Sequence, residues 1–145
     1  MRNFGSIVAS AVVIGTWMAS PAGAAEITLD AGPTIKWITS AAPGGNPTIP
    51  LAPGDVLVIR QSDPNLTHGF VFDDASVNIP LCDVAPPPGA TFCLISAYGA
   101  KITGLGVPPH GEIMRLRVLQ AIPAEMGFHC TQHFGLMKGT VKSAP

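Results

Sequence analysis

Short segments in which apolar and polar residues alternate, separated by turns rich in glycine and proline, limit most strongly how this chain can fold. The segment EIMRLRVL places Met114, Leu116 and Val118 on one face and two arginines on the other. A period of two residues is that of a half-buried β-strand. Similar segments are TIKWIT (34–39), DVLVIRQ (55–61), THGFVFDD (67–74), MGFHC (126–130) and KGTVKS (138–143). No stretch has the spacing of an amphipathic helix, so the sequence predicts an all-β, Greek-key β-sandwich.

The stretch from Val77 to Gly111 is rich in loops, with the runs APPPGA and GLGVPPHG, and we expect one further strand in it at about residues 90–97. The chain holds 16 glycines and 15 prolines, yet 47% of its residues are apolar. This balance favours many turns between short buried strands over disorder. We see no boundary after the N-terminal segment and therefore predict a single domain, residues 26–145.

The N-terminal segment, residues 1–25, has the pattern of a secretory signal peptide. Arg2 precedes an apolar run, and Ala22, Gly23 and Ala24 are the small residues that a signal peptidase recognises. The run is short for a membrane span, which needs about 20 apolar residues. We therefore expect export to the periplasm, with no membrane anchor in the mature form.

Charge is sparse, at 12% of residues, and the formal net charge is −1. Because no basic patch is available to meet phosphate groups, a nucleic-acid partner is disfavoured.

Three cysteines in an exported chain leave one unpaired. Cys82 and Cys93 flank DVAPPPGATF, a run that can turn the chain back on itself. We predict a local disulfide bond between them, with two free thiols as the alternative. Cys130 is then the unpaired thiol.

Cys130 lies in the segment GFHCTQHFGLMKG near the end of the chain. If GFHC is extended, Phe128 and Cys130 share the inward face and His129 points outward. The glycine-containing stretch that follows must turn. His133 and Met137 lie on that turn and can fold back towards the thiol.

A second histidine that should face inward lies upstream, in THGFVFD. There His68 lies on the same face as Phe70 and Phe72, so it points inward from a strand end. A buried neutral imidazole needs a partner, and a metal ion would supply one. We assign His129 to the surface and His110, in PPHG, to a loop.

These residues and their contexts resemble the copper site of the cupredoxins, the blue copper proteins that include plastocyanin, pseudoazurin and amicyanin. That family has an upstream strand-end histidine, then Cys-x2-His, then a methionine. The matching residues are His68, Cys130, His133 and Met137. The segments LAPGDVLVIRQSDPNLTHGFVFD, IPAEMGFHCTQH and MKGTV resemble the surrounding strands of the family. The resemblance implies a cupredoxin-like sandwich that holds one copper ion.

Two features depart from the family pattern. Three residues separate His133 from Met137, a gap shorter than in plastocyanin-like proteins and longer than in amicyanin, while azurin has this gap but a longer Cys-to-His spacing. The axial bond length and reduction potential therefore stay open. Gly69 also stands where many cupredoxins have an asparagine that braces the copper loop. HGF is similar to the binuclear copper domain of cytochrome oxidase, but the loop lacks the second cysteine which that site requires.

The ligand set itself favours copper. Two imidazoles, a thiolate and a thioether suit both Cu(I) and Cu(II), and apolar neighbours would keep water away. Zinc is the alternative, but structural zinc sites take a fourth thiolate, imidazole or carboxylate instead of a methionine.

The sequence thus favours a periplasmic type 1 copper protein, not an enzyme, that carries single electrons between larger redox partners. Those partners would dock near His133, because TQHFGL carries no charge and predicts an apolar patch with weak salt dependence. One alternative is a copper carrier, whose ligands would be more exposed and whose Cu(II) form would lack intense colour. Another is a catalytic copper enzyme, which would need an open coordination position or a second copper ion.

Overall fold

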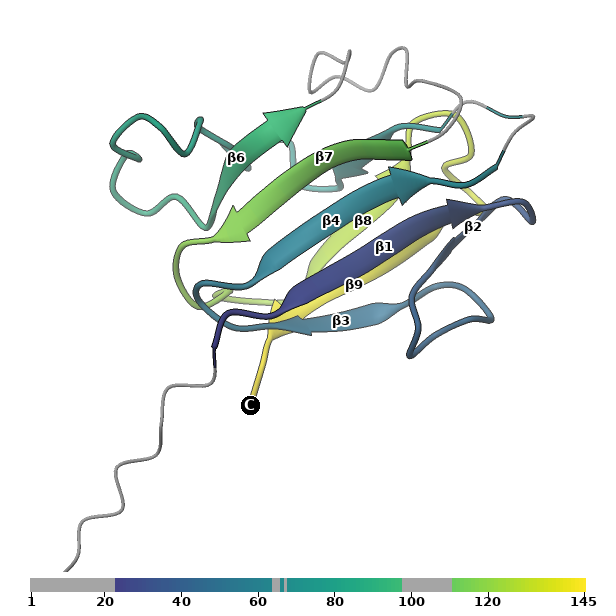
Figure 1. The fold of residues 1–145 in the computed structure, drawn as a ribbon, viewed down its shortest axis with the longest axis horizontal. Helices are drawn as coiled ribbons and strands as arrows, with labels where there is room; N and C mark the ends of the chain where they lie inside the picture. Colours follow the sequence, from purple (N-terminus) through teal and green to yellow (C-terminus); the bar gives the residue numbers. More distant parts are fainter. Residues whose placement is uncertain (1–22, 64–65, 67, 98–110) are drawn as a thin grey trace, which may run out of the picture.

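The computed structural model of the chain describes residues 23–63, 66, 68–97 and 111–145. Within these residues the fold is all-β, with nine strands and no helix, in two sheets that stack face to face (Figure 1). The predicted all-β sandwich is therefore confirmed. Residues 1–22, which hold most of the expected signal peptide, lie outside the described part, as does His110.

The first sheet has five strands in the order β2-β1-β4-β7-β6. It is mixed, because β1 runs parallel to β4 while the other neighbours are antiparallel. Its strands are β1 (Glu26–Gly32), β2 (Lys36–Ile38), β4 (Val56–Gln61), β6 (Phe92–Ala97) and β7 (Gly111–Val118). Met114, Leu116 and Val118 of β7 are all buried, as the alternation of that segment predicts.

The second sheet has four strands in the order β3-β9-β8-β5, namely β3 (Thr48–Leu51), β9 (Lys138–Ser143), β8 (Met126–Cys130) and β5 (Phe70–Phe72). β3 is parallel to β9, and the other pairs are antiparallel. The chain crosses between the sheets at every connection from β2 to β6, and again from β7 to β8.

Apolar side chains from the inner faces of both sheets form one core. Trp37 of β2 is fully buried, and its ring meets Phe70 and Phe128 of the opposite sheet edge-on, with ring centroids 6.0 and 6.4 Å apart. Each such pair adds about 0.5–1.5 kcal/mol beyond the area it buries. These contacts hold β5, which follows His68, and β8, which ends at Cys130, against the first sheet.

The strand predictions are most accurate at the end of the chain, where MGFHC and KGTVKS coincide with β8 and β9. The additional strand expected at about residues 90–97 is β6. The sequence does not predict β1, whose burial comes from its place between two neighbouring strands and not from strict alternation. Nor does it predict β3, which contains Pro50, a residue that strands accept at a sheet edge such as this one.

Cys82 and Cys93 form the predicted disulfide bond, with Cα atoms 5.0 Å apart, and Cys130 is a free, buried thiol. Backbone hydrogen bonds from Leu94 to Pro80 and from Cys82 to Leu94 tie the same loop to β6. None of the described residues forms a helix long and apolar enough to cross a membrane.

Candidate metal centre

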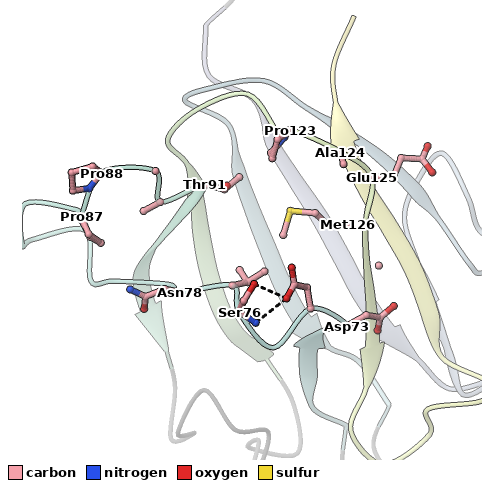
Figure 2. A pocket seen from close by; sticks show the side chains of 15 residues that line it. Asp73, Ser76, Asn78, Pro87, Pro88, Thr91, Pro123, Ala124, Glu125 and Met126 are labelled. Carbon is pink, nitrogen blue, oxygen red and sulfur yellow. Dashed lines mark hydrogen bonds between the residues drawn. The ribbon is translucent and has the colours of Figure 1, made fainter.

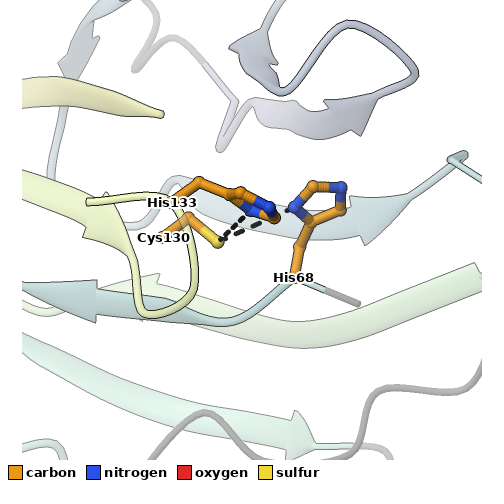
Figure 3. Close-up of side chains that lie close together, drawn as sticks. All are labelled: His68, Cys130 and His133. Carbon is orange, nitrogen blue, oxygen red and sulfur yellow. Dashed lines mark hydrogen bonds between the residues drawn. The ribbon is translucent and has the colours of Figure 1, made fainter. Parts of the chain in front are cut away.

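Three of the four residues that the sequence singles out as ligands come together at one end of the sandwich (Figure 3). One potential ligand atom from each of His68, Cys130 and His133 lies within 4.8 Å of the others. The Cys130 Sγ is 3.7 Å from Nδ1 of His68 and 3.6 Å from Nδ1 of His133. Cys130 and His68 are fully buried and His133 is half-buried, so this cluster has one side near the surface.

Strand pairing places the thiol beside the upstream histidine. Cys130 is the last residue of β8 and pairs with Phe70, the first residue of β5, so its side chain enters the core next to His68. Just beyond the strands, the Thr131 amide donates a hydrogen bond to the Gly69 carbonyl at 3.2 Å. This main-chain hydrogen bond ties the start of the loop after Cys130 to the residue that follows His68.

The loop from Cys130 to Met137 is closed by its own backbone. The amides of Leu136 and Met137 both donate to the His133 carbonyl at 2.9 Å, and the Cys130 amide donates to the Met137 carbonyl at 2.9 Å. These bonds turn His133 back towards the thiol and return the chain to β9. Met137, at the end of this loop, is fully buried.

The surroundings of His68 lower the pKa of its imidazole. Burial lowers its pKa below the usual 6.5, nearby His133 acts in the same direction, and the Asp63 carboxylate opposes both. The net lowering favours the neutral imidazole, the form with a lone pair for a metal.

Two polar residues near His68 are missed by the sequence analysis. Gln61 is 2% exposed and Asp63 is 1% exposed, and both contact the histidine or its backbone. The alternation of side chains along β4 could have identified Gln61, because it continues the inward-facing series of Leu57 and Ile59. A glutamine at a core position needs hydrogen-bond partners. The segment that follows β4 supplies them.

His129 occupies the outward position that its phase predicts. Its Nδ1 pairs with the Asp73 carboxylate, and its ring meets Phe134 edge-on with centroids 4.4 Å apart. It is not part of the cluster that could hold a metal ion.

A cavity of about 520 Å³ lies at the opposite end of β5 and β8, beyond Asp73 and Met126 (Figure 2). Asp73, Asp74 and Glu125 give it an acidic lining, and Ser76 donates its hydroxyl and amide to the Asp74 carboxylate. None of the residues of the metal cluster lines it.

Comparison of the sequence with known protein families and with curated proteins finds no match to either. The function is therefore inferred from the cluster itself. Two imidazole nitrogens and one sulfur, from two buried residues and one half-buried residue, form a donor set suited to a soft or borderline transition-metal ion.

Proposed function

We propose that this chain is an exported, periplasmic type 1 copper protein that carries single electrons between redox partners and is not an enzyme. The observation that supports it most is the convergence of a buried thiol with two imidazole Nδ1 atoms at 3.6 and 3.7 Å. His68, Cys130 and His133 would hold the copper ion, with Met137 as the fourth ligand. When bound, the ion would supply a one-electron couple.

The surroundings are those of an ion that is retained. Cys130 and His68 are shielded from water, and the loop between Cys130 and Met137 is held by backbone hydrogen bonds. A carrier that hands over copper would need ligands that a partner can reach. Ligand atoms already gathered within 4.8 Å of one another would limit rearrangement between the two oxidation states, which supports electron transfer.

The electron would leave through His133, the one half-buried member of the cluster. Two large apolar side chains follow it, Phe134 at 66% exposed and Leu136 at 64% exposed. We call these two residues the apolar patch. Contiguous exposed apolar surface marks sites of protein association, and we propose that a redox partner docks over these two residues.

Copper titration of the exported domain tests the proposal. We expect one Cu(II) per chain, an intense visible band from thiolate-to-copper charge transfer, and the loss of that band in Cys130→Ser. The matched control is His129→Gln, which alters the neighbouring histidine outside the cluster and should leave the band in place. Colourless binding that survives Cys130→Ser would contradict the proposal and favour a copper carrier.

A further inference from the structure

The two ring nitrogens of His68 face different partners. Nδ1 lies 3.7 Å from the Cys130 sulfur, whereas Nε2 lies 3.4 Å from Oδ2 of Asp63. Figure 3 shows one ring nitrogen turned towards the thiol and the other turned away from it. The imidazole and the carboxylate are both excluded from solvent, at 0% and 1% exposed. A carboxylate is rarely buried this deeply unless it is paired.

The position of Asp63 is fixed by its own neighbours. The amides of Ser62 and Asp63 both donate to the Ala31 carbonyl at 3.2 Å. The Gln61 side-chain amide donates to the carbonyls of Asp63 at 3.0 Å and Leu66 at 2.5 Å.

The same glutamine also holds the histidine. Its Oε1 accepts a hydrogen bond from the His68 amide at 3.3 Å. One buried side chain of β4 therefore links the main chain of Asp63 to that of His68, the two residues whose side chains are in contact.

We propose that Asp63 is a positioning residue of the metal centre, which accepts the Nε2 proton of His68 and leaves Nδ1 free to bind the ion. The inference rests on the proposed copper function. A carboxylate that accepts from a ligating histidine fixes its tautomer and raises its basicity. In a buried site its charge is weakly screened, so it stabilises the more highly charged oxidised ion relative to the reduced one.

The alternative is that Asp63 only holds the loop in place. A structural role would change stability without changing the balance between the two oxidation states. The reduction potential separates the two roles, because it reports the ratio of Cu(II) to Cu(I) affinities.

The test measures that potential in the copper-loaded protein for Asp63→Asn, Asp63→Glu and Asp73→Asn. Asp63→Asn should lower Cu(II) affinity about tenfold more than Cu(I) affinity, which raises a one-electron potential by about 59 mV. Asp63→Glu restores the charge and should lie closer to the native potential. Asp73→Asn removes the carboxylate of the His129 pair, which lies outside the cluster, and should change the affinity ratio less than about twofold. An unchanged potential in Asp63→Asn would overturn the inference.

A second measurement needs no substitution and stands even if Asp63→Asn does not fold. Nitrogen NMR shifts of His68 in the diamagnetic Cu(I) protein report which ring nitrogen carries the proton. Protonation at Nε2 supports the inference, and protonation at Nδ1 overturns it. Absence of a thiolate-to-copper band in the native protein would instead overturn the proposed function, and this inference with it.

Discussion

Phe128 of β8 and Gly139 of β9 are paired across the second sheet, and the Phe128 ring occupies the space above the glycine. A Cβ atom on Gly139 would lie 2.5 Å from Cζ of Phe128 and 2.7 Å from the Pro47 carbonyl oxygen. The absence of a side chain at Gly139 lets the buried ring of Phe128 lie over β9, the strand that follows the loop from Cys130 to Met137.

Gly139→Ala should therefore lower the free energy of unfolding by about 1–3 kcal/mol, the typical range when a packed core must accept an extra methyl group. The obstacle includes main-chain oxygen as well as the ring, so a side-chain rotation alone cannot remove it. Urea unfolding measures the loss. Gly44→Ala is the control, since a Cβ there meets nothing within 4 Å. Equal stability of the two variants would contradict this packing argument.

The disulfide bond should stabilise the fold without shaping the metal centre. It closes a short loop, with a sequence separation of 11, and fixes that loop to β6 of the first sheet. Replacing both Cys82 and Cys93 by serine should cost at most about 3 kcal/mol of unfolding free energy on the chain-entropy account. The copper band should persist, because Cys130 is on β8 of the other sheet. Loss of the band in this double variant would show that the loop supports the site.

Much of the candidate metal centre could be predicted, because the alternation of side chains along a strand shows which residues face the core. In β8 the inward positions of Phe128 and Cys130 follow from alternation alone, and both are fully buried. His68 is inward by the same rule, two residues before Phe70. The fold class follows from the same alternation repeated along the chain.

Asp63 could not be predicted in this way. It lies in the loop after β4, where no period relates a residue to a face, and its burial depends on hydrogen bonds from Gln61 and to Ala31. The hydrogen bond from the Thr131 amide to the Gly69 carbonyl could not be predicted either, because every residue has a main-chain carbonyl. Sequence reasoning found the residues of the candidate cluster and missed the polar groups that contact them.

Acid should destabilise the metal-free protein through His68. Burial lowers the pKa of this histidine in the folded state, with His133 adding to the effect and Asp63 opposing it, whereas the unfolded chain protonates near the usual 6.5. Below pH 6.5 the unfolded state therefore binds more protons, so the free energy of unfolding falls as the pH falls. Well above that pH the imidazole is neutral in both states and contributes no slope.

Urea unfolding of the metal-free protein between about pH 7.5 and about pH 5 measures this dependence. His68→Gln removes the titrating group and should show a shallower fall over the same window. An identical slope in the native protein and the variant would assign the acid sensitivity to other groups.

The apolar patch beside His133 should control encounters between copies of the copper-loaded protein, which can serve as their own redox partners. Electron self-exchange, measured by NMR line broadening in mixtures of the oxidised and reduced forms, should depend weakly on ionic strength in the native protein, because Phe134 and Leu136 carry no charge. Leu136→Lys should slow the exchange about tenfold at low salt, because it brings two like charges together in the encounter complex. Added salt should restore part of the rate by screening that repulsion.

Leu81→Lys is the matched control for this substitution. Leu81 is 51% exposed but pairs with Leu94 of the first sheet, so a lysine there should leave the exchange rate and its salt dependence near the native values. A native rate that falls or rises steeply with ionic strength would mean that charged groups guide the encounter. In that case the docking surface would lie elsewhere, and Leu136→Lys would have no larger effect than Leu81→Lys.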